Sequence, residues 1–177
     1  MVMTGDDLGA TFDEHVRHEF ETRDVEATMA TMTADPYVNH VPTLAGGTGR
    51  DDVRAFYSDH FIGQWPADTR IEVISRTVGA DRVVDELVIG FTHDLVMDTF
   101  LPGVPPSGKR VELPLVVVVG FGGGKVASEH IYWDQASLLV QIGLLDPDGL
   151  PVTGAEQARK LMDPSQPSNV LMGRSGG

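Results

Sequence analysis

The sequence predicts an α+β fold in which N-terminal helices pack on a strongly curved antiparallel sheet. Two observations carry this prediction. Apolar side chains recur at helical spacing in the first third of the chain, whereas residues 69–134 alternate or stay apolar between tight turns. Helices followed by strands favour an α+β arrangement with the helices on one face of the sheet, and tight turns between strands make that sheet antiparallel. Helices across the concave side of a bent sheet would enclose a conical cavity.

The helices are predicted from capping residues that precede apolar positions at helical spacing. Thr11 and Glu14 form a capping box, and Asp24 can cap a second, short helix. Thr48 with Asp51 indicates the start of a third helix. The apolar positions that follow the three caps are Phe12, Val16, Phe20, Val25, Met29, Met32, Val53, Phe56, Tyr57 and Phe61.

The strands are predicted from alternation and from apolar runs. Proline ends the second helix in "ADPYVNHVP", because proline and its predecessor both leave the helical region. We expect extended segments over residues 37–41, 69–78, 82–98, 111–121 and 126–134. The long middle segment should bend near Gly90. The loop "FLPGVPPSGKR", together with Trp65 and Phe100, is interpreted either as a lid over the cavity or as a stiff connection.

The chain length predicts one main domain. Domains usually run about 100–200 residues, and the chain has 177. We expect the domain over residues 1–150. A capping box at Thr153 and Glu156 starts a further short helix, and residues 151–177 are otherwise expected to form a weakly ordered tail.

Composition excludes several classes of function. The chain carries 26 acidic residues against 13 lysines and arginines, a net charge of −13, which argues against nucleic acids and anionic membranes as partners. The absence of cysteine excludes disulfides and thiolate chemistry. No apolar run approaches the ~20 residues of a membrane span, and "MVMTGDDLGA" has no apolar core of a signal peptide. We therefore expect a cytoplasmic protein.

Three local segments make the sequence resemble the NTF2-like superfamily, in particular its SnoaL-like branch, which shares its fold with ketosteroid isomerases. These segments are "NHVP", "GRDDVRAFY" and "GGGKVASEHIYWDQASLLVQIG". The resemblance covers roughly residues 8–145. It implies an NTF2-like cone with an apolar pocket, often dimeric, in a family of isomerases, polyketide cyclases, epoxide hydrolases, dehydratases and proteins without demonstrated chemistry. Fold alone does not choose among these activities.

Asp134 is the strongest candidate for acid/base chemistry, because the resemblance implies that an acidic residue near the tryptophan faces the pocket. Burial raises the pKa of such a carboxyl group toward neutrality. The alternative is that Asp134 caps the helix that begins at Gln135. In the strand before it, His130 shares a face with Asp134, and Glu129 points the other way, to the surface or a dimer contact, unless a bulge exchanges the two faces.

Further candidates come from other segments. His40, near Tyr37, precedes the glycine loop, where the resemblance implies the pocket mouth; a structural role is the alternative. Glu86 is an isolated carboxylate in an apolar strand. We predict no metal site and no cofactor, because "HVRH", with His15 and His18, lies on a mostly charged helix face that should be solvated.

The leading hypothesis is a small cofactor-independent enzyme that performs acid/base proton transfer, of isomerase, cyclase or hydrolase type. Its substrate would be an apolar cyclic or carbonyl compound in an enclosed pocket, and the protein would form a homodimer. The alternatives are a non-catalytic small-molecule-binding module and a purely structural dimer. The expected catalytic residues are Asp134, His130 and His40, and the expected substrate-binding residues are Tyr37, Tyr57, Trp65, Glu86, Phe91 and Tyr132.

Overall fold

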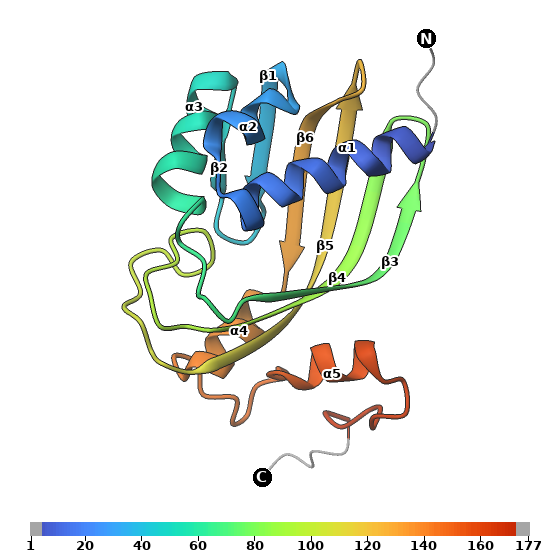
Figure 1. Cartoon of the computed structure of the whole chain (residues 1–177). Helices are drawn as coiled ribbons and strands as arrows, with labels where there is room; N and C mark the ends of the chain where they lie inside the picture. The colour runs from blue at the N-terminus through green and yellow to red at the C-terminus, as the bar shows by residue number, and fades with distance from the viewer. Residues whose placement is uncertain (1–4, 173–177) are drawn as a thin grey trace.

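Helices cover the concave side of a strongly curved sheet, which confirms the predicted α+β class. The computed structural model describes residues 5–172. Its six-stranded sheet has the order β2-β1-β6-β5-β4-β3 (Figure 1). The strands are β1 (Met32–His40), β2 (Ala45–Thr48), β3 (Arg70–Val78), β4 (Arg82–Thr92), β5 (Arg110–Gly122) and β6 (Lys125–Trp133). Within the described residues, no helix is long and apolar enough to cross a membrane.

Strand β1 makes the sheet mixed rather than purely antiparallel. It pairs antiparallel with β2 but parallel with β6, through registers such as Val38 with Glu129. The predicted extended piece of residues 37–41 is thus part of a longer strand that contains Pro36. The register with β6 shifts between Met32 and Tyr37, and such an irregularity is where a strand tolerates a proline, which cannot donate to the ladder.

Helix α1 (Gly5–Arg17) crosses the concave face of the sheet and continues into a π-helical turn, η1 (His18–Thr22) (Figure 1). The helix therefore begins before Thr11, and the predicted capping box there is wrong. Its buried positions Leu8, Phe12 and His15, with Glu19 in η1, have the spacing i, i+4, i+7 and i+11. This spacing places all four side chains on one face of the helix, toward the sheet.

The next helices close one side of the molecule. Helix α2 (Val25–Ala30) is capped as predicted, with the Asp24 side chain accepting from Ala27 N–H at 3.0 Å. Helix α3 (Arg50–Phe56) follows Gly49 without a side-chain cap, contrary to the prediction for Thr48, and leads into the π-helical turn η2 (Tyr57–Phe61). The main hydrophobic core lies between these helices and the sheet.

Strand β4 ends at Thr92, earlier than the predicted residue 98, and the chain from there to β5 forms an irregular loop. Met97, Phe100 and Leu101 in this loop are buried. After β6 come α4 (Gln135–Ile142) and α5 (Glu156–Met162). Helix α5 packs against β5, outside the cavity between α1 and the sheet (Figure 1).

Candidate active site

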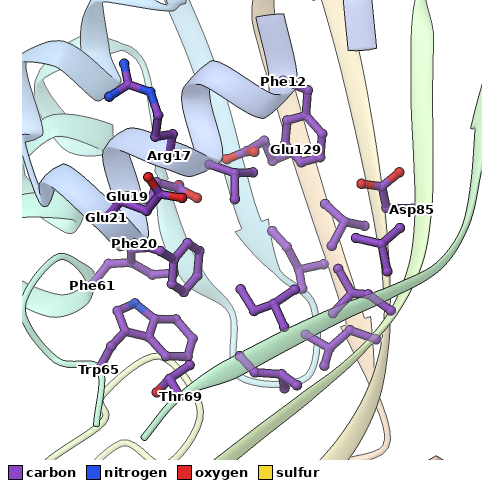
Figure 2. Close-up of a pocket in the computed structure, with 18 of the residues that line it drawn as sticks. Phe12, Arg17, Glu19, Phe20, Glu21, Phe61, Trp65, Thr69, Asp85 and Glu129 are labelled. Atoms are coloured by element: carbon purple, nitrogen blue, oxygen red, sulfur yellow. The ribbon is translucent and has the colours of Figure 1, made fainter. Parts of the chain in front are cut away.

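A cavity of about 550 Å³ lies between the concave face of the sheet and the helical layer (Figure 2). One wall is mostly aromatic, with Phe12, Phe20, Phe61, Trp65 and Phe100; the other is aliphatic, with Ile71, Val73, Leu87, Ile89, Leu115, Val117 and Ile131. Ionisable side chains interrupt these apolar walls in two groups, built around the buried Glu129 and Asp85, and the exposed Arg17, Glu21 and Arg23 line the cavity as well. The cavity thus has the dimensions of a small-molecule site, with apolar walls and ionisable groups set into them.

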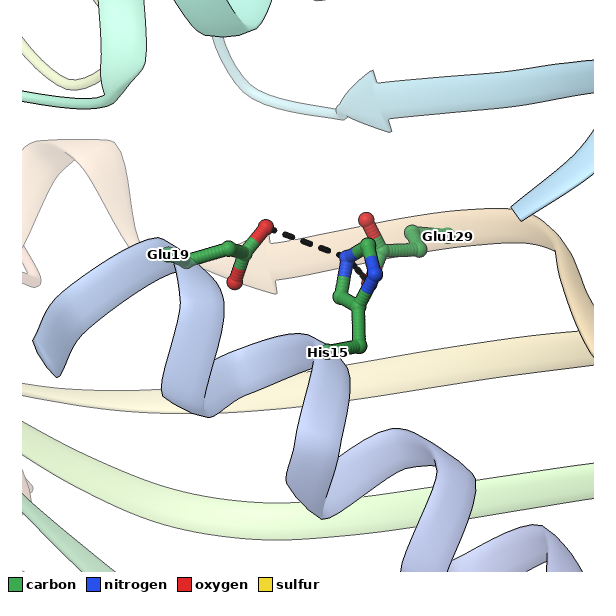
Figure 3. A group of neighbouring side chains, drawn as sticks. All are labelled: His15, Glu19 and Glu129. Atoms are coloured by element: carbon green, nitrogen blue, oxygen red, sulfur yellow. Dashed lines mark ion pairs between the residues drawn. The ribbon is translucent and has the colours of Figure 1, made fainter. Parts of the chain in front are cut away.

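The first ionisable group is a buried cluster of His15, Glu19, Glu129 and Tyr57. His15 Nε2 lies 3.2 Å from Glu19 Oε1 and 3.5 Å from Glu129 Oε1 (Figure 3). Tyr57 Oη donates to Glu129 Oε2 at 2.7 Å and lies 3.2 Å from His15 Nε2. Both glutamates line the cavity, whereas His15 and Tyr57 stand behind them. The cluster therefore presents carboxylates to a ligand and supports them from the helical side.

The pleat of β6 decides which of its side chains reaches this cluster. Glu129 and Ile131 point toward the helices and line the cavity, with Glu129 only 4% exposed. His130 points to the opposite face, where its ring contacts that of Tyr37 at 5.5 Å. The predicted alternation along the strand is confirmed, but the two faces were assigned the wrong way round. Glu129, expected at the surface, is the carboxylate in the cavity wall.

Thr31 fixes the orientation of the His15 ring. Its hydroxyl donates to the Thr28 carbonyl at 2.6 Å, so its oxygen is left to accept from His15 Nδ1–H, also at 2.6 Å. With Nδ1 as a donor, Nε2 is the nitrogen that faces the two glutamates. This chain of bonds holds the ring edge against the cavity wall in the way that outer partners orient functional histidines.

The surroundings of His15 favour its charged form. Burial by itself lowers the pKa of an imidazole, but the charges of Glu129 and Glu19 outweigh it and raise the pKa of His15 to about 10. The histidine is therefore an imidazolium at neutral pH, with both N–H groups donating.

One imidazolium between two carboxyl groups leaves the glutamates in different states. If both were ionised, the buried cluster would carry a net negative charge, which is costly in an apolar site. Burial raises the pKa of Glu19. Burial also opposes ionisation of Glu129, but the His15 charge and the Tyr57 hydrogen bond prevail and lower its pKa. The neutral combination is charged His15, ionised Glu129 and protonated Glu19. Two carboxyl groups whose pKa values are pushed apart can divide the acid and base roles.

His40, expected at the pocket mouth, is buried in the cavity wall next to this cluster. Its Nδ1 is 3.2 Å from the Ala45 carbonyl oxygen, so Nδ1 carries the hydrogen and Nε2 is an acceptor. Rings of Phe56, Phe61 and Phe100 surround it. Burial lowers the pKa of His40 to about 4, and the ring is neutral at physiological pH.

Asp134 lies outside the cavity, and its predicted placement in the wall is wrong. Its Oδ1 accepts from Ala136 N–H at 2.9 Å and Ser137 N–H at 3.3 Å, and its Oδ2 accepts from Gln157 at 2.6 Å. The carboxylate is thus the N-cap of α4 and ties that helix to α5. The alternative prediction, that Asp134 caps the following helix, agrees with the structure, because the strand ends one residue before Asp134.

The remaining predicted binding residues divide between the cavity and other surfaces. Trp65 lines the cavity, and Tyr57 lies behind its wall. Phe91 is buried beside Phe100 but does not itself line the cavity. Three lie on the outer face of the sheet: Glu86, which accepts from Ser75 at 3.1 Å, and the partly exposed Tyr37 and Tyr132. These three side chains therefore point away from the cavity, and they cannot contact a ligand inside it.

His15, Glu19 and Glu129 are the site residues that sequence reasoning missed. The interpretation of the "HVRH" face as solvated is wrong, because His15 is fully buried. The spacing of Leu8, Phe12 and His15 could have indicated that His15 is buried, because the histidine lies on the same helix face as the two apolar side chains.

The same three side chains have the donor set for a metal ion. Within the described residues, one ligand atom from each of His15, Glu19 and Glu129 lies within 4.8 Å of the others. Histidine with two carboxylates suits a divalent ion such as zinc. The distances of Nε2 to both carboxylates fit N–H···O bonds, so the His15 proton can supply the positive charge that the carboxylates require.

Comparison with known proteins places the chain in a protein family. The model of the SnoaL-like polyketide cyclases matches residues 11–142. The chain belongs to this family. No curated protein matches the chain by sequence.

Solved structures of SnoaL-like and NTF2-like proteins share the architecture. AclR, a candidate hydroxylase from Streptomyces galilaeus, superposes with a TM-score of 0.61 at 22% identity over 81% of this chain and 89% of its own. TsrD from Streptomyces laurentii gives a TM-score of 0.64 at 17% identity over 81% and 99%. SalBIII, an epoxide hydrolase/cyclase-like enzyme of pyran ring formation in salinomycin, gives 0.54 at 19% over 73% and 92%. At these identities the likeness establishes the fold alone.

Proposed function

We propose that this protein is a cofactor-independent enzyme that transfers protons to and from an apolar cyclic compound bearing a carbonyl or ether oxygen. The observation that carries the proposal is the pair of cavity-lining carboxyl groups, Glu129 and Glu19, held by the buried His15. Membership of the SnoaL-like cyclases and likeness to a cyclase-like enzyme support acid/base chemistry of the cyclase or hydrolase type.

Glu129 would act as the base. Its carboxylate is ionised, lines the cavity and is held at Oε2 by Tyr57. A fixed carboxylate in an apolar wall can remove a proton from a carbon next to a carbonyl, or from a hydroxyl that attacks during ring closure. His15 would remain charged throughout and stabilise the ionised state of Glu129 between turnovers.

Glu19 would act as the acid. Burial raises the pKa of its carboxyl group, which favours the protonated form, and it lines the same cavity. It can donate that proton to an oxygen on which negative charge develops. His40 is neutral, and its Nε2 can accept a hydrogen bond from a substrate hydroxyl. Proton transfer by such groups accelerates reactions by about 10²–10⁴-fold.

Deuterium exchange into 2-tetralone tests the proposal without knowledge of the natural substrate. This bicyclic ketone is apolar and has acidic hydrogens beside its carbonyl. We expect the protein to accelerate exchange in D₂O, followed by NMR, and Glu129→Gln to lose about 10²–10⁴-fold of the rate. Glu14→Gln, on the exposed side of α1, is the matched control and should keep the full rate.

Either of two results would overturn the assignment. Binding of 2-tetralone without accelerated exchange would favour the alternative, a non-catalytic binding module. Exchange that survives Glu129→Gln would remove Glu129 as the base. The homodimer and the cytoplasmic location expected from the sequence remain predictions, and sedimentation measurements would test the first.

A further inference from the structure

A second ionic group lines the cavity on the β4 side, separate from the glutamate cluster. Asp85 is 2% exposed. Arg76 donates two hydrogen bonds to it, from Nε to Oδ1 and from Nη2 to Oδ2, both at 2.7 Å. Arg76 Nη1 also donates to Asp13 Oδ1 at 2.8 Å, and its guanidinium lies 5.6 Å from the ring centre of Phe12. Asp13, Arg76 and Asp85 all line the cavity.

The position of Asp85 on the sheet is unexpected for a structural ion pair. Along β4 it falls between Val83 and Leu87 on the buried, apolar face. The burial of a charge there is costly unless the charge is paired. Each Asp85 oxygen receives one bond from Arg76, and a carboxylate has about four acceptor sites. Asp85 therefore keeps acceptor capacity in a wall that a ligand can touch.

The sheet register places Asp85 well away from Glu129. Glu129 pairs with Val119, which pairs with Val83, so Asp85 is two strands across and two residues along. With strands about 4.8 Å apart and about 3.3 Å per residue, the two Cα atoms are separated by about 12 Å. The concave curvature brings the side-chain ends closer together, and Figure 2 shows apolar side chains of the wall near both carboxylates. The cavity wall thus carries two carboxylates, on β4 and β6, separated by the apolar side chain of Val117 on β5.

The charge of this second group selects the ligand chemistry. One arginine between two aspartates has a net charge of −1, and both aspartates line the cavity with it. A negative group repels carboxylates and favours groups that donate hydrogen bonds. The acceptor capacity of Asp85 suits a neutral hydroxyl, which needs no counterion in an apolar cavity.

We propose that Asp85, held by Arg76, is a specificity-determining subsite that binds a hydroxyl group of the substrate, at the end of a fused-ring molecule opposite the Glu129 end. This inference rests on the proposed function only in taking Glu129 as the reacting end. The substrate is then a two-ended molecule, with a reacting group at one end and a hydroxyl at the other.

A matched pair of fluorescent probes tests the subsite by equilibrium titration. 2,6-Dihydroxynaphthalene carries a hydroxyl at both ends, whereas 6-methoxy-2-naphthol has similar size but only one donor. Because a hydrogen bond to a charged acceptor changes affinity by about 10–100-fold, the wild-type protein should bind the first probe at least about 10-fold more tightly. 6-Hydroxy-2-naphthoate should bind more weakly than both.

Two variants assign the preference to Asp85. Asp85→Asn should reduce the ratio between the two neutral probes to within about 3-fold, below the effect of one such bond. Glu86→Gln, on the outer face of β4 beside Asp85, should leave the ratio unchanged. Because the wild-type comparison needs no substitution, it remains decisive even if Asp85→Asn fails to fold.

Three results would overturn the subsite: no preference in the wild-type protein, a preference that survives Asp85→Asn, or tightest binding of the naphthoate, which would indicate an anion site at Arg76. These measurements need no turnover. If 2-tetralone exchange occurs without probe preference, only the subsite fails. If the preference is present without exchange, only the proposed function fails.

Discussion

His15 and Glu129 come from opposite layers of the molecule, and His15 Nε2 meets Glu129 Oε1 at 3.5 Å in the cavity wall. The histidine belongs to α1 and the glutamate to β6. Their contact therefore exists only when α1 lies across the concave face of the sheet. This dependence links the stability of the fold to the ionisation of the site.

The first prediction concerns alkaline pH. The pKa of His15 is raised from 6.5 to about 10, so its contribution to stability is fully present below pH 6.5 and is lost as the pH rises to about 10. The loss should be on the order of 4 kcal/mol. Urea unfolding between pH 6 and 10 would measure it. His18→Gln, at a partly buried neighbouring position outside the cluster, should keep this pH dependence and His15→Gln should abolish it; equal slopes would contradict the assignment.

The two glutamates should respond differently to the same substitution. Glutamine resembles a protonated glutamate, so Glu19→Gln should change the free energy of unfolding by less than about 1 kcal/mol at pH 7. Glu129→Gln leaves the His15 charge without its ionised partner and should cost about 3–5 kcal/mol. Denaturant titration would measure both, with Glu14→Gln as the reference. A larger loss for Glu19 would reverse the acid and base roles.

Asp134 should matter for stability and not for chemistry. Removal of its cap of α4 by Asp134→Ala should cost about 1 kcal/mol, and the lost bond to Gln157 adds to this cost. Asp134→Asn keeps a capping oxygen and should cost less. The rate of 2-tetralone exchange should be the same in both folded variants. A rate loss comparable to that of Glu129→Gln would return Asp134 to the active site.

His40 should stay neutral under mildly acid conditions. Burial lowers its pKa from 6.5 to about 4, so its contribution to stability is present above pH 6.5 and is lost as the pH falls to about 4. The NMR shift of its imidazole Cε1–H should remain constant from pH 8 to about 5.5, whereas that of an unperturbed histidine moves near pH 6.5. A midpoint near 6.5 for His40 would show that the ring is hydrated rather than buried.

Much of the fold follows from local patterns. Alternation in "TRIEVISRTV" and the apolar run "LVVVVGF" correspond to β3 and β5, because side chains on successive strand residues point to opposite faces. Asp24 predicted the start of α2 because a side-chain oxygen satisfies a free N–H of the first turn. The start of α1 was missed because Thr11 and Glu14 resemble a cap within a longer helix.

The alternation of Glu129 and His130 on β6 was determined by the sequence alone, as was the order of helices before long strands. For Asp134 the sequence offered a helix cap only as one of two alternatives, and it predicted a loop where β2 lies. Only the tertiary structure decided which face of β6 is buried, because that depends on α1 lying across it. It also decided that His15 and Glu129, far apart in the chain, would form an ion pair. Local periodicity specifies which side chains share a face of a strand or helix. The packing of distant layers determines which of those faces is exposed to water and which lines the cavity.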